Sequence, residues 1–208
     1  MTYSVHEELK PSGLNGISDE QINDHWKLYE GYIKQANGLK EELAELRKDG
    51  KGGSALYADR RRRFGFEYNG MVLHEYYFGN LKAGVDLSGA SQFKAAIEEQ
   101  FGSFDAWKED FCNAGKTRGV GWAICAMDPM TGDINNHFIQ LHEDGNVAGY
   151  HPLVVMDVWE HAYMVDHKAG GRGDYINAVM SNINWDVVES RLEEARSKAT
   201  SKRFASAA

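Results

Sequence analysis

The stretch MDVWEHAYMVDHK, residues 156–168, places Asp157 and His161 four residues apart among aromatic side chains. An aspartate and a histidine at this spacing could form a catalytic dyad, ligate a metal ion, or simply stand at the start of a buried helix. Because Asp157 follows the apolar run PLVVM, its carboxylate needs a cation, hydrogen bonds or a metal ion as compensation. A role as N-cap of the following helix would meet part of this need and is compatible with metal ligation.

Two further histidines lie in segments with helical spacing. His25 precedes Tyr29 and Tyr32 by four and seven residues, so the three share one helix face. His74 lies in NGMVLHEYYFGNL, where an imidazole without a partner would be costly. Either histidine could instead belong to an aromatic core. If both converge with Asp157 and His161, three imidazoles and one carboxylate suit iron, manganese or zinc and leave a position for water or substrate.

Hydrophobic periodicity predicts the elements that position these residues. We expect a helix over residues 18–46 with Ser18 as N-cap, and a second over residues 59–81 that ends near Gly84. Two shorter helices should follow, with Ser91 and Ser103 as caps. Strand patterns then occupy residues 122–128, 133–141 and 151–157, helical patterns return at 159–166 and 174–198, and the tail from residue 199 looks frayed.

Segregated helices and strands indicate an α+β fold. We expect an N-terminal α-helical hairpin domain, residues 1–85, followed by an α/β domain, residues 86–208, with a three-stranded antiparallel sheet.

The composition of the chain argues against some classes of function. The 208 residues carry a net charge of −8, which argues against nucleic acid as a partner, and Arg60–Arg63 is better explained as a solvated helix start than as a phosphate-binding patch. We expect no membrane span, because no apolar run is long enough. Cys112 and Cys125 lie outside any CxxC spacing and are expected reduced in the core, so the cytoplasm is the simplest location.

Taken together, these segments resemble the iron/manganese superoxide dismutase family. DVWEHAY, Asp157–Tyr163, matches the signature stretch of that family with two metal ligands, and NGMVLHEYYFGNL resembles its second-helix ligand segment. GVGWA, with Trp122, and GRGDYINAVMSNINWDVV, with Arg172, resemble two further family patterns. The resemblance covers roughly residues 15 to 195.

The resemblance implies ping-pong conversion of superoxide to dioxygen and hydrogen peroxide by one iron or manganese ion per subunit. The implied ligands are His25, His74, Asp157 and His161, with a solvent molecule as the fifth. It also implies a homodimer, or a tetramer, in which Glu160 reaches the partner's His161 and Tyr163 belongs to the interface. Trp122, Trp159 and other aromatic side chains would keep bulk water from the ion.

Three departures from the family pattern concern the surroundings of the ion. Leu28 and Tyr29 stand where imidazoles are common, which affects the proton route, and Tyr32 is the expected gateway tyrosine. Phe78 stands where a tryptophan is common.

The third departure concerns the glutamine that family members often place beside the bound solvent. One of its two source positions is Gly70 here, and the other falls on His142. His142 is therefore expected to contact the solvent; the alternatives are that it is an ordinary loop residue or that His137 takes the role.

An anionic substrate and an acidic protein require local positive charge, for which Lys27 and Arg172 are the candidates. A histidine at position 142 favours iron, or the use of either metal. The rival functions are a non-catalytic protein that keeps the fold and a non-haem iron oxygenase. Four intact ligand positions argue against the first, and a third histidine argues against the second. A di-iron carboxylate bundle would need Glu-x-x-His pairs that the expected helices lack.

Overall fold

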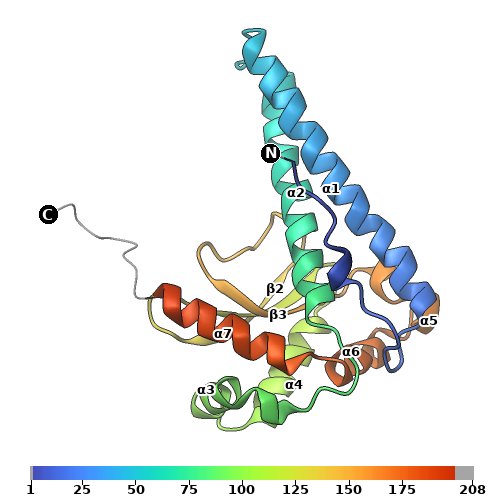
Figure 1. The fold of residues 1–208 in the computed structure, drawn as a ribbon, viewed down its shortest axis with the longest axis vertical. Helices are drawn as coiled ribbons and strands as arrows, with labels where there is room; N and C mark the ends of the chain where they lie inside the picture. Colours follow the sequence, from blue (N-terminus) through green and yellow to red (C-terminus); the bar gives the residue numbers. More distant parts are fainter. Residues whose placement is uncertain (1, 200–208) are drawn as a thin grey trace, which may run out of the picture.

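The computed structural model describes residues 2–199, and its most conspicuous feature is a long helical hairpin (Figure 1). Helices α1 (Asp19–Lys48) and α2 (Ala55–Gly79) run antiparallel and project beyond the rest of the molecule. A three-stranded sheet and the remaining helices gather around the other end of the hairpin. The α+β class expected from the sequence is confirmed.

Helix α1 begins where its sequence predicts. The Ser18 hydroxyl accepts a hydrogen bond from the Gln21 N–H, which satisfies one of the free donors of the first turn. Ile22, Trp26 and Ile33 are buried along one face, and the helix ends at Lys48, two residues beyond the expected end.

The predicted limits of α2 were wrong at both ends. The helix begins four residues early, because the Ser54 hydroxyl accepts a hydrogen bond from the Tyr57 N–H and caps it there. It ends at Gly79, because Leu81 forms an isolated antiparallel bridge with Ile183 instead of continuing the helix.

Helices α3 (Ser91–Phe101) and α4 (Phe104–Gly115) follow a short 3₁₀ turn, η2 (Leu87–Gly89). Ser103 caps α4 by accepting a hydrogen bond from the Ala106 N–H, as expected. Ser91 is not a cap; it is the first residue of α3, and the N-cap position belongs to Ala90.

The sheet consists of β1 (Trp122–Met127), β2 (Ile134–Ile139) and β3 (His151–Asp157). The strand order is β2-β1-β3 and both pairings are antiparallel, so β1 is the central strand. All six residues of β1 are buried, as expected for a strand covered on both faces. Trp122 pairs with Asp157, which places both side chains at the same end of the sheet.

After the sheet come η3 (Glu160–Ala162), α5 (Met164–His167), α6 (Arg172–Ser181) and α7 (Trp185–Ala199); another 3₁₀ turn, η1 (Glu7–Leu9), precedes α1. The run expected over residues 174–198 is thus broken. The Asn182 side chain donates to the carbonyl oxygens of Ala178 and Asn15, and Ile183 joins the bridge to Leu81. Most of the expected frayed tail, residues 200–208, lies outside the described residues.

None of the helices within residues 2–199 combines the length and the apolar character that a membrane crossing requires.

Asn80 joins the hairpin to the sheet. Its side-chain oxygen accepts a hydrogen bond from the Val155 N–H at 2.8 Å, and its carbonyl accepts one from the Asn184 N–H at 2.9 Å. The side chain is fully buried, so these contacts are shielded from water. Asn80 lies six residues after His74, and its partner Val155 lies two residues before Asp157 on β3. The contact between Asn80 and Val155 therefore fixes the end of α2 against β3.

We predict that Asn80→Ala lowers the free energy of unfolding by about 2 kcal/mol, because the buried Val155 N–H loses its acceptor. Denaturant unfolding of the two proteins measures the difference. Asn113→Ala, at an exposed position of α4, is the matched control and should change stability by less than about 0.5 kcal/mol. Equal effects of the two substitutions would contradict the role given to Asn80.

Candidate metal centre

Four side chains from four elements meet at one point in the interior. His25 comes from α1, His74 from α2, Asp157 from the end of β3 and His161 from η3. One ligand atom from each lies within 4.8 Å of the others. His25, His74 and Asp157 are buried, whereas the His161 side chain is 25% exposed. The structure thus brings together all four residues expected from the sequence to ligate a metal.

A single carboxylate oxygen lies at the middle of this cluster. Asp157 Oδ2 is 3.0 Å from His25 Nε2, 3.2 Å from His161 Nε2 and 3.7 Å from His74 Nε2. His74 Nδ1 donates to the Gly70 carbonyl oxygen at 2.6 Å, so Nε2 carries the lone pair. That Nε2 is buried without a hydrogen-bond partner. A buried, unpartnered imidazole nitrogen aimed at a carboxylate fits a metal ion, with the Gly70 contact fixing the ring.

The protonation states in the cluster also suit a cation. Burial lowers the pKa of both His25 and His74, so these imidazoles are neutral near pH 7. Burial alone would raise the pKa of Asp157, but its hydrogen bonds and electrostatic interactions with His161 and His25 hold that pKa well below its usual range. Neutral imidazoles with an ionised carboxylate are the forms in which these groups bind a metal.

Asp157 is held in place through both its side chain and its backbone. Its Oδ1 accepts a hydrogen bond from the Trp159 N–H at 2.7 Å, and its carbonyl accepts one from the Tyr175 hydroxyl at 2.7 Å. Asp157 is the last residue of β3, and the N-cap position of η3 belongs to Trp159. Asp157 is therefore not the N-cap that the sequence suggested. Its carboxylate still satisfies a free backbone N–H, as an N-cap would, through a local turn contact with Trp159.

Gln21 is a positioning residue that the sequence did not reveal. Its buried side chain donates to the His161 carbonyl at 2.7 Å and accepts from the Val165 N–H at 3.0 Å. It thereby attaches the His161 segment to α1, one turn before His25. The only signal in the sequence is a glutamine on the face of α1 that also carries Ile22 and His25.

Aromatic rings enclose the cluster. The Phe78 ring centre is 5.0 Å from that of His25, and the Trp122 ring centre is 5.0 Å from that of His74. Trp159 stacks on His161 at 5.8 Å. Phe78 and Trp122 are buried, so this side of the cluster excludes bulk water.

Comparison with known proteins agrees with this geometry. Residues 89–191 match the family model described as the C-terminal domain of iron/manganese superoxide dismutases. An iron superoxide dismutase of Aquifex aeolicus is 38% identical over 194 residues, covering 91% of this chain and 90% of the relative. A manganese/iron superoxide dismutase of Aeropyrum pernix is 36% identical over 181 residues, covering 84% and 82%. A manganese superoxide dismutase of Haloferax volcanii is 33% identical over 182 residues, covering 86% and 88%.

The chain belongs to the iron/manganese superoxide dismutase family. By that membership it is an oxidoreductase whose cofactor is iron or manganese, and the four clustered side chains offer one site for such an ion.

The first departure from the family pattern changes a hydrogen-bond network. Leu28 is exposed on α1, whereas Tyr29 is fully buried. The Tyr29 hydroxyl donates to Glu75 at 3.1 Å and accepts from the His6 N–H at 3.2 Å. A tyrosine–glutamate pair therefore occupies the neighbourhood in which family members often have imidazoles.

Tyr32 and His142 lie together beside the ligand cluster. Their ring centres are 4.9 Å apart, and the Tyr32 ring is 5.1 Å from that of His74. His142 lies in the loop after β2 and not on the strand itself, yet it is fully buried. Burial lowers the pKa of His142 to about 4 and raises that of Tyr32. Both side chains are consequently neutral near pH 7.

Gly70 makes room for this pair. A Cβ atom at Gly70 would lie 2.7 Å from Cδ1 of Tyr32 and 2.8 Å from Nδ1 of His142. The neighbouring Asn69 side chain donates to the His142 carbonyl at 2.9 Å and fixes its loop on α2. Glycine at position 70 and histidine at position 142 are thus sterically complementary.

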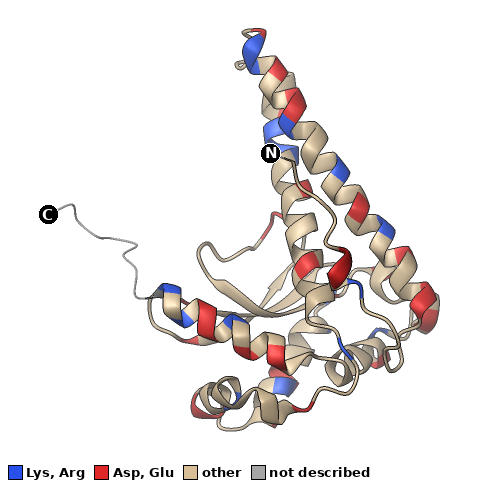
Figure 2. Ribbon diagram, in the orientation of Figure 1, with Lys and Arg blue, Asp and Glu red and all other residues tan. Residues whose placement is uncertain are grey.

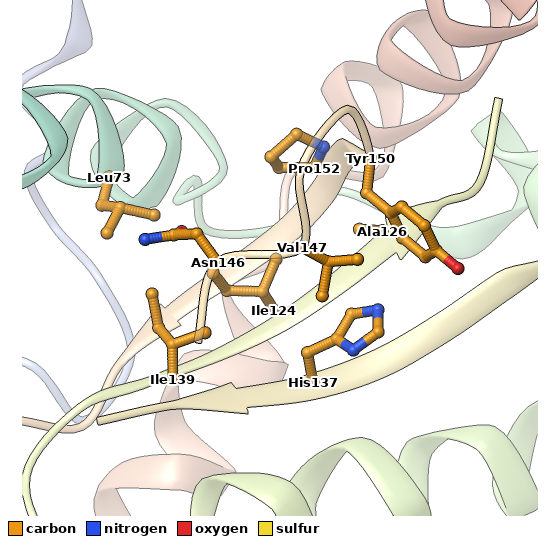
Figure 3. A pocket seen from close by; sticks show the side chains of 9 residues that line it. All are labelled: Leu73, Ile124, Ala126, His137, Ile139, Asn146, Val147, Tyr150 and Pro152. Atoms are coloured by element: carbon orange, nitrogen blue, oxygen red, sulfur yellow. The ribbon is translucent and has the colours of Figure 1, made fainter. Parts of the chain in front are cut away.

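His137, the alternative to His142, faces a different part of the molecule. It lines a cavity of about 80 Å³ with Tyr150, Asn146 and apolar side chains, between β1, β2 and the loop before β3 (Figure 3). Its ring centre is 5.2 Å from that of Tyr150.

The remaining predicted residues are exposed or contact residues outside the ligand cluster. Arg172, at the start of α6, donates to the carbonyl oxygens of Gly115 and Gly119 and so ties α6 to the segment before β1. Lys27 is exposed and paired with Asp24 at 2.8 Å. Glu160 is exposed beside His161, and Tyr163 is buried against Tyr175 with ring centres 5.5 Å apart.

We predict that Gly70→Ala destabilises the protein by about 1 to 3 kcal/mol, because the added methyl group displaces Tyr32 or His142. Gly65→Ala is the matched control on the same helix, since its Cβ would meet no atom within 4 Å. That substitution should instead stabilise by about 0.5 to 1 kcal/mol. Urea unfolding distinguishes them, and stabilisation by both substitutions would show that the site tolerates the methyl group.

Proposed function

We propose that this protein dismutes superoxide with one iron or manganese ion held by His25, His74, Asp157 and His161. The observation that carries the proposal is the buried convergence of three imidazole nitrogens on one ionised carboxylate. Membership of the iron/manganese superoxide dismutase family supports the same activity.

Two superoxide ions and two protons yield one dioxygen and one hydrogen peroxide. An iron or manganese ion held by the four clustered residues would supply the one-electron chemistry, because either metal can be trivalent or divalent. Asp157 would offset part of the charge of the ion, and imidazole ligands, which bind metals in their uncharged form, would leave the rest in place to attract an anion. Phe78, Trp122 and Trp159 limit the access of water to the reacting molecules.

Tyr32 and His142 are the residues that we propose to handle protons. The His142 ring is buried with neither nitrogen in a well-formed hydrogen bond, although the Phe66 carbonyl approaches it. These nitrogens can therefore donate to, or accept from, a small polar molecule in the site. The ring of Tyr32 lies beside those of His142 and His74, and its hydroxyl can hold or donate a proton at its Oη.

The ligand set suits iron and manganese alike. Relatives at similar identity are described as iron, manganese and manganese/iron enzymes. A histidine at position 142, in place of an amide that is fixed as a donor, favours iron or the use of either ion.

We also propose that the protein is a homodimer, or a tetramer built from it, in which Glu160 approaches the partner's His161. Glu160 is exposed and His161 is 25% exposed on the same 3₁₀ turn, so both are accessible to a second chain.

We further propose that the chain is divided into two domains, residues 1–85 and residues 86–208. A cytoplasmic location is supported by Cys112 and Cys125, which are buried and unpaired.

The direct test removes the metal and reloads the protein separately with iron and with manganese. We predict dismutation of superoxide by at least one loaded form, with activity proportional to bound metal. Asp157→Ala should lose both metal and activity, because three neutral imidazoles alone do not offset the charge of the ion. Elemental analysis and superoxide consumption provide the two readouts.

Asp133→Ala, at an exposed position, is the control and should retain metal and activity. Full metal occupancy in the Asp157 variant would refute the ligand assignment. Tight metal binding by the wild-type protein without activity in either form would refute the proposed reaction.

We predict that His142→Gln keeps the metal but changes the ratio of iron-supported to manganese-supported turnover. The glutamine amide offers a fixed donor where the imidazole could donate or accept, which alters the balance between the two oxidation states. His137→Gln, in the separate cavity, should leave the ratio unchanged. An unchanged ratio in both variants would exclude His142 from the reaction.

A further inference from the structure

A groove of about 610 Å³ runs between α1 and α2 and includes Tyr32 in its lining. Charged side chains of both signs line it: the basic Lys27, Lys34, Arg60 and Arg63, and the acidic Glu42 and Glu67. Figure 2 shows basic and acidic residues mixed along α1. Because the protein has a net charge of −8, only a local arrangement of charge can attract an anion to this groove.

Lys27 and Arg60 have acidic partners at the surface. Lys27 pairs with Asp24 at 2.8 Å. Arg60 pairs with Glu42 at 2.8 Å and with Asp59 at 2.9 Å, both of which are substantially exposed. In such pairs both charges face solvent, so their fields largely cancel and are screened by salt.

Arg63 is arranged differently. Its Nε and Nη2 lie 2.7 Å and 2.6 Å from the same oxygen of Glu67, one helical turn further along α2. The Glu67 side chain is 5% exposed, whereas that of Arg63 is 53% exposed. The Glu67 carboxylate of this pair is therefore buried, whereas the Arg63 side chain is exposed to solvent at the groove.

The Phe66 ring contacts this guanidinium and also lies near His142 and Tyr32. The Arg63 guanidinium carbon lies 4.2 Å from the centre of the Phe66 ring. The same ring is 4.4 Å from the ring of His142 and 6.1 Å from that of Tyr32. Burial dominates the pKa shifts of Tyr32 (raised) and His142 (lowered), and the positive charge of Arg63 adds a smaller lowering contribution to both, as expected for a nearby cation. Arg63 thus lies against a ring that is itself close to His142 and Tyr32, the two residues beside the ligand cluster.

We propose that Arg63, fixed by Glu67 and Phe66, is a positioning residue that draws the superoxide anion along the groove to Tyr32. The inference rests on the proposed dismutase function. Glu67 and the Phe66 ring restrict the guanidinium, which lines the groove, so it loses less side-chain entropy on attracting an anion than a mobile lysine would. We propose Arg63 beside Lys27 and Arg172, which the sequence suggested for this role and which stay predictions.

The competing explanation is that Arg63 and Glu67 form an ordinary ion pair within a helix, which stabilises α2 and nothing else. The double variant Arg63→Gln/Glu67→Gln separates the two explanations. It removes both charges, so it leaves the net charge unchanged and leaves no buried carboxylate without a partner. Lys94→Gln/Glu98→Gln is the matched control, because it removes a partly exposed pair of the same spacing from α3.

We predict that the Arg63/Glu67 double variant, loaded with metal, lowers kcat/KM for superoxide by roughly threefold to tenfold. Its kcat should stay within about twofold, and the fall of kcat/KM with rising ionic strength should become shallower. The Lys94/Glu98 variant should match the wild type in all three. Arg63→Lys, which keeps the cation, should retain most of the dependence on ionic strength.

Azide, a small monovalent anion that binds to metal ions, provides a second readout that does not require dismutation. Its Kd, from spectroscopic titration of the iron-loaded protein, should rise by a similar factor in the Arg63/Glu67 variant only. A wild-type azide Kd in that variant, or a fall in kcat with unchanged KM and unchanged dependence on ionic strength, would overturn the proposal. Failure of the proposed function would show as absent turnover in the wild type, with the azide comparison still deciding the role of Arg63.

Discussion

The structure depends on one buried carboxylate. Asp157 closes the last strand of the sheet in the interior, and a charge in that position is costly unless it is compensated. Histidines from two helices of the hairpin and from the turn after the strand supply that compensation. This requirement explains why the hairpin docks on this end of the sheet. Asn80, Gln21 and Tyr175 form the hydrogen bonds that hold the docked elements in place.

Much of this arrangement could be predicted from the sequence. Periodicity located both long helices and all three strands, because their packing repeats along the chain at a fixed interval. The four clustered residues stand out because imidazole and carboxylate are unusual in apolar segments. The position of His142 came from the resemblance alone, since nothing in its loop indicates that the side chain is buried.

The sequence was less informative where a contact joins distant segments. The break at Asn182 depends on Asn15, 167 positions earlier, and on the bridge between Ile183 and Leu81. Gln21 looks like any polar residue near a helix start, and its function depends on the His161 backbone. The sequence gives no reason to distinguish the four arginines of Arg60–Arg63, yet Arg63 differs from its neighbours because its partner Glu67 is buried. Such distinctions depend on tertiary neighbours, which periodicity does not encode.

The separation of the ligands along the chain has a further consequence. His25 and Asp157 are 132 positions apart, and they lie on opposite sides of the contact between the hairpin and the sheet. An ion held by both would join two regions that otherwise contact each other through side-chain packing and hydrogen bonds. Its binding free energy would add to the stability of the native state, which would then increase with the free concentration of the metal. Resistance to heat and to proteolysis would increase in parallel.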